Sequence, residues 1–194
     1  MIGSKYDGIY ANNVTDITIT NSRVLNCNDG IEVYNSKDRV IVENNVLTGN
    51  NHYGMYLSGD AELFCENNTV IGSEYGVYLN GLNGYDVEIT NVSADIPIDF
   101  SNVNFENILI QNVTSISGSR DSININGNIE NLTIENANLN LNKHGVGILL
   151  DGYLKDVIIK DAIIRDPYWA GIQLKRSINA YYYKNVTIDI TITC

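Results

Sequence analysis

Tyrosine and carboxylate side chains recur at one position of a short repeated phrase. The first copy reads Gly8-Ile9-Tyr10-Ala11, with apolar residues on either side of the third position. In the eight copies the third position holds Tyr10, Glu32, Tyr56, Tyr78, Asp99, Asn124, Leu149 and Gln173. Tyrosine rings can stack on sugars, and carboxylates accept hydrogen bonds from hydroxyls. We call these eight residues the outward file, because the apolar residues on either side of each would face the core. The outward file predicts carbohydrate binding. The alternative is that tyrosine simply suits an exposed strand.

The segments that lead into these phrases add further candidates. Glu74 precedes the fourth copy and offers another acceptor for hydroxyls. Trp169, the only tryptophan, follows Tyr168 just ahead of the last copy. An exposed Trp169 predicts a stacking platform, with a capping role at the side of the fold as the alternative. Both histidines, His52 and His144, lie in segments of this kind and are candidates for acid–base chemistry.

A second repeated phrase predicts the elements that position these residues. Val40-Ile41-Val42-Glu43-Asn44 returns along the whole chain, with 21 to 25 residues between its closing Asn or Asp residues. A period in this range predicts a solenoid, and the alternation within each phrase predicts half-buried strands. We expect an all-β, single-stranded, right-handed parallel β-helix of about eight coils, each with three strands. One such domain would cover residues 1–194.

The closing position of the second phrase predicts a ladder of side chains. A tight corner needs a residue that tolerates left-handed backbone angles, which Asn does at lower cost than other non-glycine types. In stacked coils the amides of these residues can then bond along the solenoid axis. The predicted ladder is Asn21, Asn44, Asn67, Asn91, Asn112, Asn136, Asp161 and Asn185.

The two phrases together closely resemble the pectin-lyase-like superfamily, in particular the regular repeat modules of its carbohydrate-binding and sugar-hydrolase proteins. The resemblance covers essentially the whole chain and implies a right-handed parallel β-helix. It leaves the activity open, because lyases, hydrolases, epimerases, phage spikes and adhesins share this fold.

Two tetrapeptides, 28–31 (Asn-Asp-Gly-Ile) and 51–54 (Asn-His-Tyr-Gly), resemble part of the polygalacturonase pattern. The resemblance implies that Asp29 is the proton donor or the water-activating carboxylate and that His52 orients it. Glu32 is the only carboxylate nearby that could pair with Asp29. The sequence departs from the pattern at Asn28, where the family has an aspartate, and at Asn51, where it has a glycine.

Three functions follow from these patterns. The first is an extracellular or surface module that binds, and in some forms processes, polysaccharide along the outward file. The second is a polysaccharide-cleaving glycosidase or lyase centred on Asp29, Glu32 and His52. The third is a structural rod of an adhesin, a phage spike or a surface filament, in which the repeats set length and stiffness.

The composition of the chain limits the classes of partner that it is expected to bind. The formal net charge is −11 and the isoelectric point is near 4.4, which argues against nucleic acid because nucleic-acid binding needs a basic surface. No apolar run reaches membrane-spanning length, so membrane insertion is not expected. The three cysteines lack metal-ligand spacing, and we therefore predict no metal and no cofactor. The expected partner is a polysaccharide or glycan.

The ends of the chain carry no recognisable cap for a solenoid. The first residues read like the tail of an earlier coil, and the last residues, 191–194, stop within a strand pattern. A solenoid needs capped ends, so we expect a fragment of a longer protein with flanking domains, or chains that associate end to end or side by side. A secreted, cell-surface or virion-surface location is expected.

Overall fold

The computed structural model describes residues 5–117, 120–175 and 183–194, and all regular elements among them are β-strands. No helix of the described residues is long and apolar enough to cross a membrane. The strands are β1 (Ile9–Asn12), β2 (Asp16–Thr20), β3 (Arg23–Leu25), β4 (Ile31–Glu43), β5 (Val46–Thr48), β6 (Tyr53–Glu66), β7 (Thr69–Asn80), β8 (Asn83–Ser115), β9 (Ile123–Asn140), β10 (Val146–Arg165), β11 (Ala170–Lys175) and β12 (Tyr183–Thr193).

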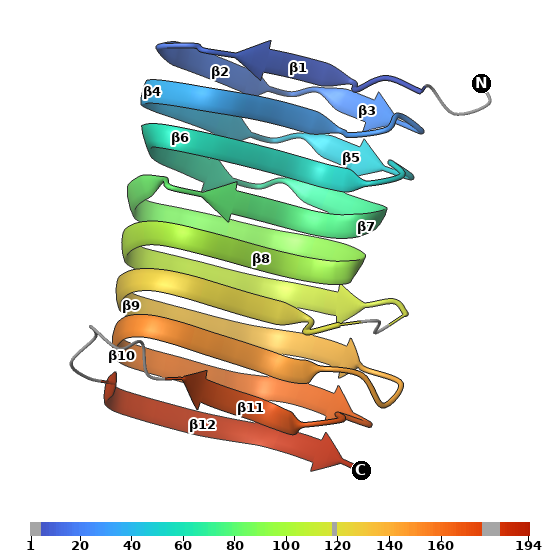
Figure 1. Cartoon of the computed structure of the whole chain (residues 1–194), viewed down its shortest axis with the longest axis vertical. Helices are drawn as coiled ribbons and strands as arrows, with labels where there is room; N and C mark the ends of the chain where they lie inside the picture. The colour runs from blue at the N-terminus through green and yellow to red at the C-terminus, as the bar shows by residue number, and fades with distance from the viewer. Residues whose placement is uncertain (1–4, 118–119, 176–182) are drawn as a thin grey trace.

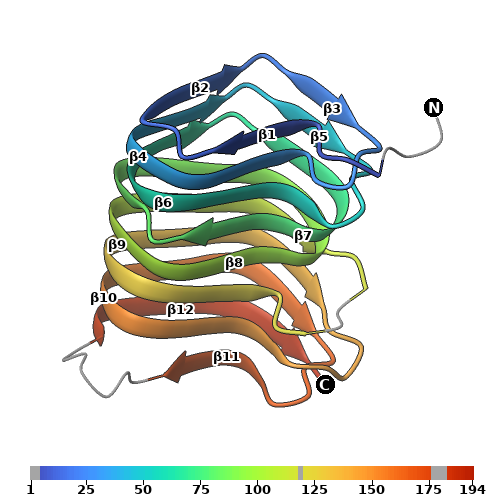
Figure 2. The same cartoon turned by 45° about the horizontal axis from the view of Figure 1, so that its top comes forward.

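The strands stack into a parallel β-solenoid (Figure 1). All strand pairs are parallel, and one sheet runs in the order β1-β4-β6-β7-β8-β9-β10-β11. Each of these strands carries one copy of the glycine phrase, so the chain completes about seven turns. The longer strands bend at the corners and continue onto the next face, which gives each coil its closed outline (Figure 2). The predicted all-β parallel β-helix is confirmed.

The core is a column of aliphatic side chains inside the coils. Ile31, Leu57, Leu79 and Ile125 point inward from the glycine phrase and are fully buried. They alternate with the outward file, as the two-residue period of a strand requires. Cys65 lies in the same core with 1% of its surface exposed.

The outward file is in register over its whole length. Tyr10 pairs with Glu32, Glu32 with Tyr56, and Tyr56 with Tyr78 in successive coils. The pairing continues through Asp99, Asn124, Leu149 and Gln173. Neighbouring members are therefore separated by one strand spacing, roughly 4.8 Å between backbones. Outward orientation does not mean solvation at every position, because neighbours cover Glu32 and Leu149.

Asparagine turns this corner in the first six predicted coils and Asp161 turns it in the seventh, in two forms. Asn21, Asn44 and Asn67 have φ near 50–57°, and two further residues separate each from the next apolar side chain of the core. Asn91 has the same left-handed backbone, yet Val92 follows it directly and pairs with Val70 of the preceding coil. The later corners are therefore two residues shorter. Asn112, Asn136 and Asp161 repeat this shorter form.

The buried ladder of the early coils lies one residue beyond the predicted column. Asn44 and Asn67 are exposed, whereas Asn45 and Asn68 are buried. Asn45 Nδ2 donates to Asn68 Oδ1 (2.9 Å) and to the carbonyl oxygen of Ile19 (2.9 Å), and Asn68 Nδ2 donates to the carbonyl of Val42 (2.7 Å). The left-handed residue turns its own side chain to solvent, and the next one turns inward. Of the predicted column, one amide contact is of the expected kind, from Asn112 Nδ2 to Asn91 Oδ1 (3.2 Å).

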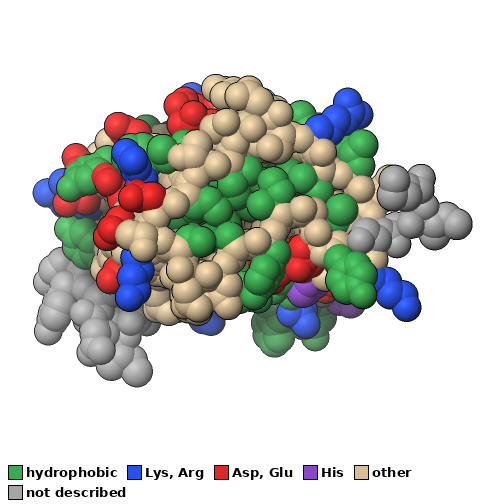
Figure 3. Space-filling view, turned by 90° about the horizontal axis from the view of Figure 1, so that it is seen from above, with side chains coloured by type: hydrophobic (Ala, Val, Ile, Leu, Met, Phe, Trp, Pro, Cys, Tyr) green, Lys and Arg blue, Asp and Glu red, His purple; other side chains and the backbone are tan. Residues whose placement is uncertain are grey.

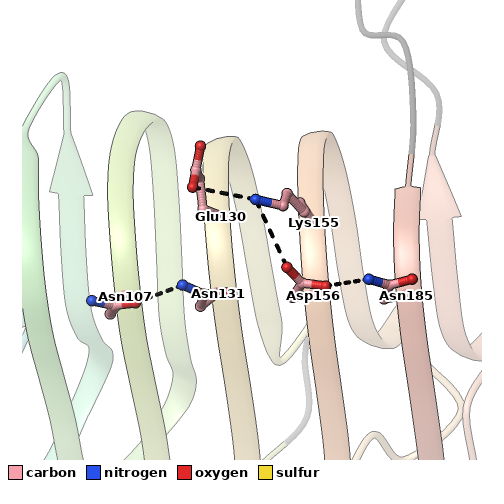
Figure 4. Close-up of polar contacts among 6 residues, drawn as sticks. All are labelled: Asn107, Glu130, Asn131, Lys155, Asp156 and Asn185. Carbon is pink, nitrogen blue, oxygen red and sulfur yellow. Dashed lines mark hydrogen bonds and ion pairs between the residues drawn. The ribbon is translucent and has the colours of Figure 1, made fainter.

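The last member of the predicted ladder is misplaced. Asn185 lies opposite Asp156, not Asp161, because Lys155 pairs with Lys184 and Val157 with Val186. Asn185 Nδ2 donates to Asp156 Oδ1 (2.5 Å), and in the same surface row Asn131 Nδ2 donates to Asn107 Oδ1 (2.7 Å) (Figure 4). In the sequence, residues 181–185 follow the pattern of the second repeated phrase, which is why Asn185 was expected in the ladder. Residues 181–182 lie outside the described residues.

Candidate functional site

Aromatic rings gather on the outer face of the glycine-phrase strands near the N-terminal end. The rings of Tyr56 and Tyr78 stack at 4.9 Å between centroids, with planes 6° apart. Tyr34 lies 4.6 Å from Tyr56, and Tyr53 lies 5.0 Å from both Tyr56 and Tyr75. We call this group the aromatic face; it comprises Tyr10, Tyr34, His52, Tyr53, Tyr56, Tyr75 and Tyr78.

Register explains the aromatic face. Tyr56 and Tyr78 are paired residues of β6 and β7, and Tyr53 pairs with Tyr75 three residues earlier on the same strands. Pairing across adjacent parallel strands brings Tyr56 beside Tyr78 and Tyr53 beside Tyr75, and the rings of Tyr53 and Tyr56 meet edge to face at 5.0 Å. Sequence reasoning identified Tyr10, Tyr56 and Tyr78 but missed Tyr34, Tyr53 and Tyr75. For Tyr53 and Tyr75 the available signal was an aromatic residue three positions before Tyr56 and before Tyr78.

An acidic trio lies beside the aromatic face. One carboxylate oxygen from each of Asp7, Asp29 and Glu32 can be chosen so that all lie within 4.8 Å of one another. Asp29 and Glu32 expose only 4% and 8% of their surface. Seen along the solenoid axis from the end that carries β1, acidic groups adjoin a histidine at one edge (Figure 3). Asp7 was missed because it precedes the first strand and packs on the next coil.

Asp29 is held by the following coil. The backbone N–H of Tyr53 donates to Asp29 Oδ1 (2.7 Å), and Asn28 Nδ2 donates to Asp29 Oδ2 (2.8 Å). His52 Nδ1 lies 3.4 Å from Asp29 Oδ1. Burial is the main reason that the pKa of Asp29 is raised; the Tyr53 N–H and His52 oppose this, and Asp7 adds to it. The structure thus brings together Asp29 and His52, which the sequence had paired by resemblance.

Glu32 also has a raised pKa. Burial is the largest cause, Asp7 and Asp29 add to it through their negative charge, and the Tyr34 hydroxyl opposes it. Two neighbouring carboxylates that resist ionisation can hold a proton at a pH where free carboxylates are charged. Burial similarly raises the pKa of Tyr53 to about 12.

The other predicted site residues lie apart from this centre. Asp99 continues the file beyond Tyr78 and accepts a hydrogen bond from Asn124 Nδ2 (2.9 Å); burial raises its pKa. Glu74 is exposed one residue before Tyr75. Trp169 exposes 76% of its surface beside Tyr168, at the far end of the sheet ahead of β11. It is too many coils away to join the aromatic face.

The part of the chain that carries the aromatic face and the acidic trio also carries a family match. Residues 1–95 match the family model described as "Periplasmic copper-binding protein (NosD)". That family is a parallel β-helix family related to the pectin-lyase-like fold, in agreement with the solenoid found here. Searches of curated proteins and of solved structures returned no match. The NosD-like segment covers just under half of the chain, and placement in the wider superfamily stays a prediction.

The family description names copper, so the potential metal ligands of the NosD-like segment can be compared with the ligands that copper prefers. Among the described residues, the acidic trio is the one group of three or more potential ligands. Carboxylates suit hard cations, whereas thiolates and thioethers select copper(I). Cys65 and Met55 are buried in the core. Among the described residues, Cys27 belongs to no group of three or more potential metal ligands. The described residues therefore do not fit a copper(I) centre.

Proposed function

We propose that this chain binds neutral polysaccharide across the aromatic face, outside the cytoplasm. The observation that carries the proposal is the stacked pair Tyr56 and Tyr78, flanked by Tyr53 and by the carboxylates of the trio. Flat rings with polar edges offer a surface for the apolar faces of sugars, and the carboxylates accept hydrogen bonds from hydroxyls. The periplasmic description of the matched family supports an envelope or surface location.

Charge decides which glycans fit. The chain carries a net charge of −11, and three carboxylates crowd the end of the face. An anionic polysaccharide would be repelled by this field, while a neutral one would not. The ligand of the proposal is therefore a neutral glycan that lies along the solenoid axis and crosses successive coils.

Glycan binding can be tested by matched tyrosine substitutions. A panel of neutral oligosaccharides is titrated against the native chain by calorimetry, together with Tyr56→Ala, Tyr78→Ala and the control Tyr85→Ala. Tyr85 is exposed on a different face and belongs to no ring contact among the described residues. We expect the first two variants to bind about 30-fold more weakly, the effect of losing a central contact, and the control to bind normally. Equal affinity of all three variants would refute the proposal.

A second candidate function, polysaccharide cleavage, is favoured by one observation. Asp29, Glu32 and His52 are gathered at one place, and the pKa values of both carboxyls are raised by burial. Glu32 would hold the proton that is delivered to a leaving glycosidic oxygen, and Asp29 would be the second carboxylate. Inverting enzymes keep their carboxyls about 6.5–9.5 Å apart and retaining ones about 5–5.5 Å.

The variant Glu32→Gln distinguishes a chain that cleaves glycans from one that only binds them. If the chain cleaves glycans, this variant should lose turnover while it keeps affinity for the oligosaccharide, because the amide retains size and hydrogen bonding but cannot deliver a proton. Product chromatography after long incubation measures turnover. Absence of products from the native chain would leave binding without catalysis. Absence of both binding and products would leave the structural rod.

A further inference from the structure

The face of the coils that follows the glycine phrases carries two exposed aromatic side chains. Phe64 of β6 and Tyr85 of β8 expose 38% and 63% of their surface. Both line a hollow of about 600 Å³, together with the half-buried Leu109. Tyr85 also lines a second hollow of about 790 Å³, so it stands between the two. We call the surface around these two hollows the Tyr85 face.

A bulge in β8 makes Tyr85 project from the sheet. Glu62 of β6 pairs with Asn83 of β8. The next pair is Cys65 with Val87, so three steps along β6 correspond to four steps along β8. The extra residue of a bulge is left out of the ladder, and its neighbourhood is turned away from the regular sheet. The backbone itself therefore holds the Tyr85 ring out toward solvent, between the two hollows.

The Tyr85 face is acidic. Five carboxylates line the larger hollow and three line the smaller one, and no lysine or arginine among the described residues lines either. Of these acids, only Glu130 forms an ion pair within the described part of the chain, with Lys155 (3.5 Å; Figure 4). Like charges on neighbouring strands destabilise a sheet, so a cationic partner would gain affinity by neutralising them.

The arrangement of these acids selects the form of the positive charge. Among the described residues, the acidic trio is the one group of three or more potential metal ligands, so the acids of the Tyr85 face do not converge on one ion. They are spread along the solenoid axis instead. The lining of the larger hollow runs from Asp38 in β4 to Tyr153 in β10. A chain with several cationic side chains would reach many of these acids, whereas a single metal ion would reach few.

The mixture of rings and acids favours a peptide over a small polyamine. Ring faces attract the cationic heads of lysine and arginine, and their apolar stems pack on hydrophobic surface. A polyamine would pair with the acids but would leave the apolar side chains of Phe64 and Leu109 uncovered. The five coil spacings from β4 to β10 amount to roughly 24 Å, a length that about seven residues of an extended chain would span.

We propose that the Tyr85 face is a docking surface for an extended basic segment of a partner protein. Tyr85 is the central anchor, Phe64 and Leu109 form an apolar wall, and the lining acids select lysine and arginine. This surface lies on a different face of the coils from the aromatic face, and its function does not depend on glycan binding.

The test uses a fluorescein-labelled peptide of about eight residues that alternates lysine and leucine, with binding followed by fluorescence anisotropy. We expect Tyr85→Ala to bind it about tenfold more weakly, because a central ring contact is lost, and Tyr56→Ala to bind it normally. Tyr85→Phe keeps the ring and should retain most of the affinity. High salt should weaken binding to the native chain, because exposed charges are screened.

A pair of charge-matched variants separates a local surface from the general charge of the molecule. Glu106 is exposed and lines the larger hollow, while Glu74 is equally exposed outside the Tyr85 face. Glu106→Gln should weaken peptide binding by about threefold, whereas Glu74→Gln should leave it unchanged. Tyr85 and Glu106 are both exposed, so their variants should melt at the native temperature.

Four outcomes would overturn the inference. Native affinity in Tyr85→Ala would remove the anchor. Equal weakening by Glu74→Gln and Glu106→Gln would reduce the effect to attraction by the net charge. Equally tight binding of a peptide that alternates glutamate and leucine would exclude recognition of charge. Full displacement of the lysine peptide by spermine at the same concentration of positive charge would assign the surface to polyamines.

Discussion

The early and the late coils turn the same corner in different ways. In the N-terminal region, residues 5–80, each Asn corner carries two extra residues, and the strands on either side are separate elements such as β2 and β3. In the C-terminal region, residues 83–193, the corner is a single left-handed residue, and strands run through it; β8 alone covers 33 residues. The wider corner leaves space, and the buried amides of Asn45 and Asn68 fill it.

The two regions also differ in what they present to solvent. The aromatic face and the acidic trio both lie in the N-terminal region. In the C-terminal region the same outward file holds Asp99, Asn124, Leu149 and Gln173, and the surface carries rows of Asn and Asp joined by side-chain bonds. The segment that matches the NosD family, residues 1–95, ends shortly after this change. One solenoid therefore combines a region with a candidate site and a region of regular rod.

The largest expected difference between the regions is in stability. Asn45→Ala removes an amide that donates to the Ile19 carbonyl and to Asn68 Oδ1 and accepts from the Ser22 N–H. The Ile19 carbonyl and the Ser22 N–H lose this partner, while Asn68 Oδ1 keeps the backbone N–H of residue 45. We expect a loss of about 3 kcal/mol in the free energy of unfolding. Asn112→Ala, in an exposed late corner, should cost about 1 kcal/mol, chiefly for the left-handed backbone. Urea unfolding followed by circular dichroism measures both, and equal losses would remove the distinction between the corners.

The next largest expected difference is the direction in which one acidic side chain of each region changes the stability of the fold as the pH rises. Burial raises the pKa of Glu32, whereas Lys160 lowers the pKa of Glu135. For Glu32 the folded state binds the proton more tightly than the unfolded state, so stability falls as pH rises through its folded pKa. Glu32→Gln should therefore raise the melting temperature at pH 7 by about 3 °C and have no effect well below pH 4.

Glu135 provides the opposite case. Its lowered pKa means that the ion pair with Lys160 (2.6 Å) adds stability above the unfolded pKa and loses it as pH falls through the folded pKa. Glu135→Gln should lower the melting temperature slightly at pH 7 and leave it unchanged in acid. Melting curves from pH 3 to 8 test both variants. Parallel pH profiles for the two would contradict the contrast between buried and paired acids.

The smallest effect concerns a contact that joins the regions. Arg120, from the C-terminal region, donates through a guanidinium nitrogen to the Tyr75 hydroxyl (3.1 Å) at the edge of the aromatic face. The contact is exposed, so Arg120→Ala should change the free energy of unfolding by less than about 0.5 kcal/mol. If the contact orients Tyr75, glycan affinity should fall by about threefold or less. A larger loss would mean that the C-terminal region contributes directly to the site.

The repeat predicted the fold and the file, because both depend on a period that every coil repeats. The alternation of apolar residues placed Tyr56 and Tyr78 side by side and put Leu57 and Leu79 inside. What the period could not predict depends on single coils. It could not show that neighbours would cover Glu32, nor that Asp7 would pack against the coil that follows it.

Two errors have the same physical origin. The buried ladder was assigned to Asn44 rather than Asn45, because a left-handed residue exposes its own side chain and turns the next one inward. Asn185 was aligned with Asp161 because the letters of its segment fit the phrase, while backbone pairing places it opposite Asp156. Similar letters around a corner do not fix which residue faces the core, since a shift of one position reverses every side chain.

The amide of Asn45 touches three successive coils, from Ile19 through its own coil to Asn68. A force applied along the axis would act, at the N-terminal end, on buried amide hydrogen bonds that join successive coils. In the late coils, the corresponding side-chain contacts are exposed to solvent. Under tension the rod should therefore peel from β12 toward β4, and its amide hydrogens should exchange with deuterium in the same order. The end that holds the aromatic face would be the last to open.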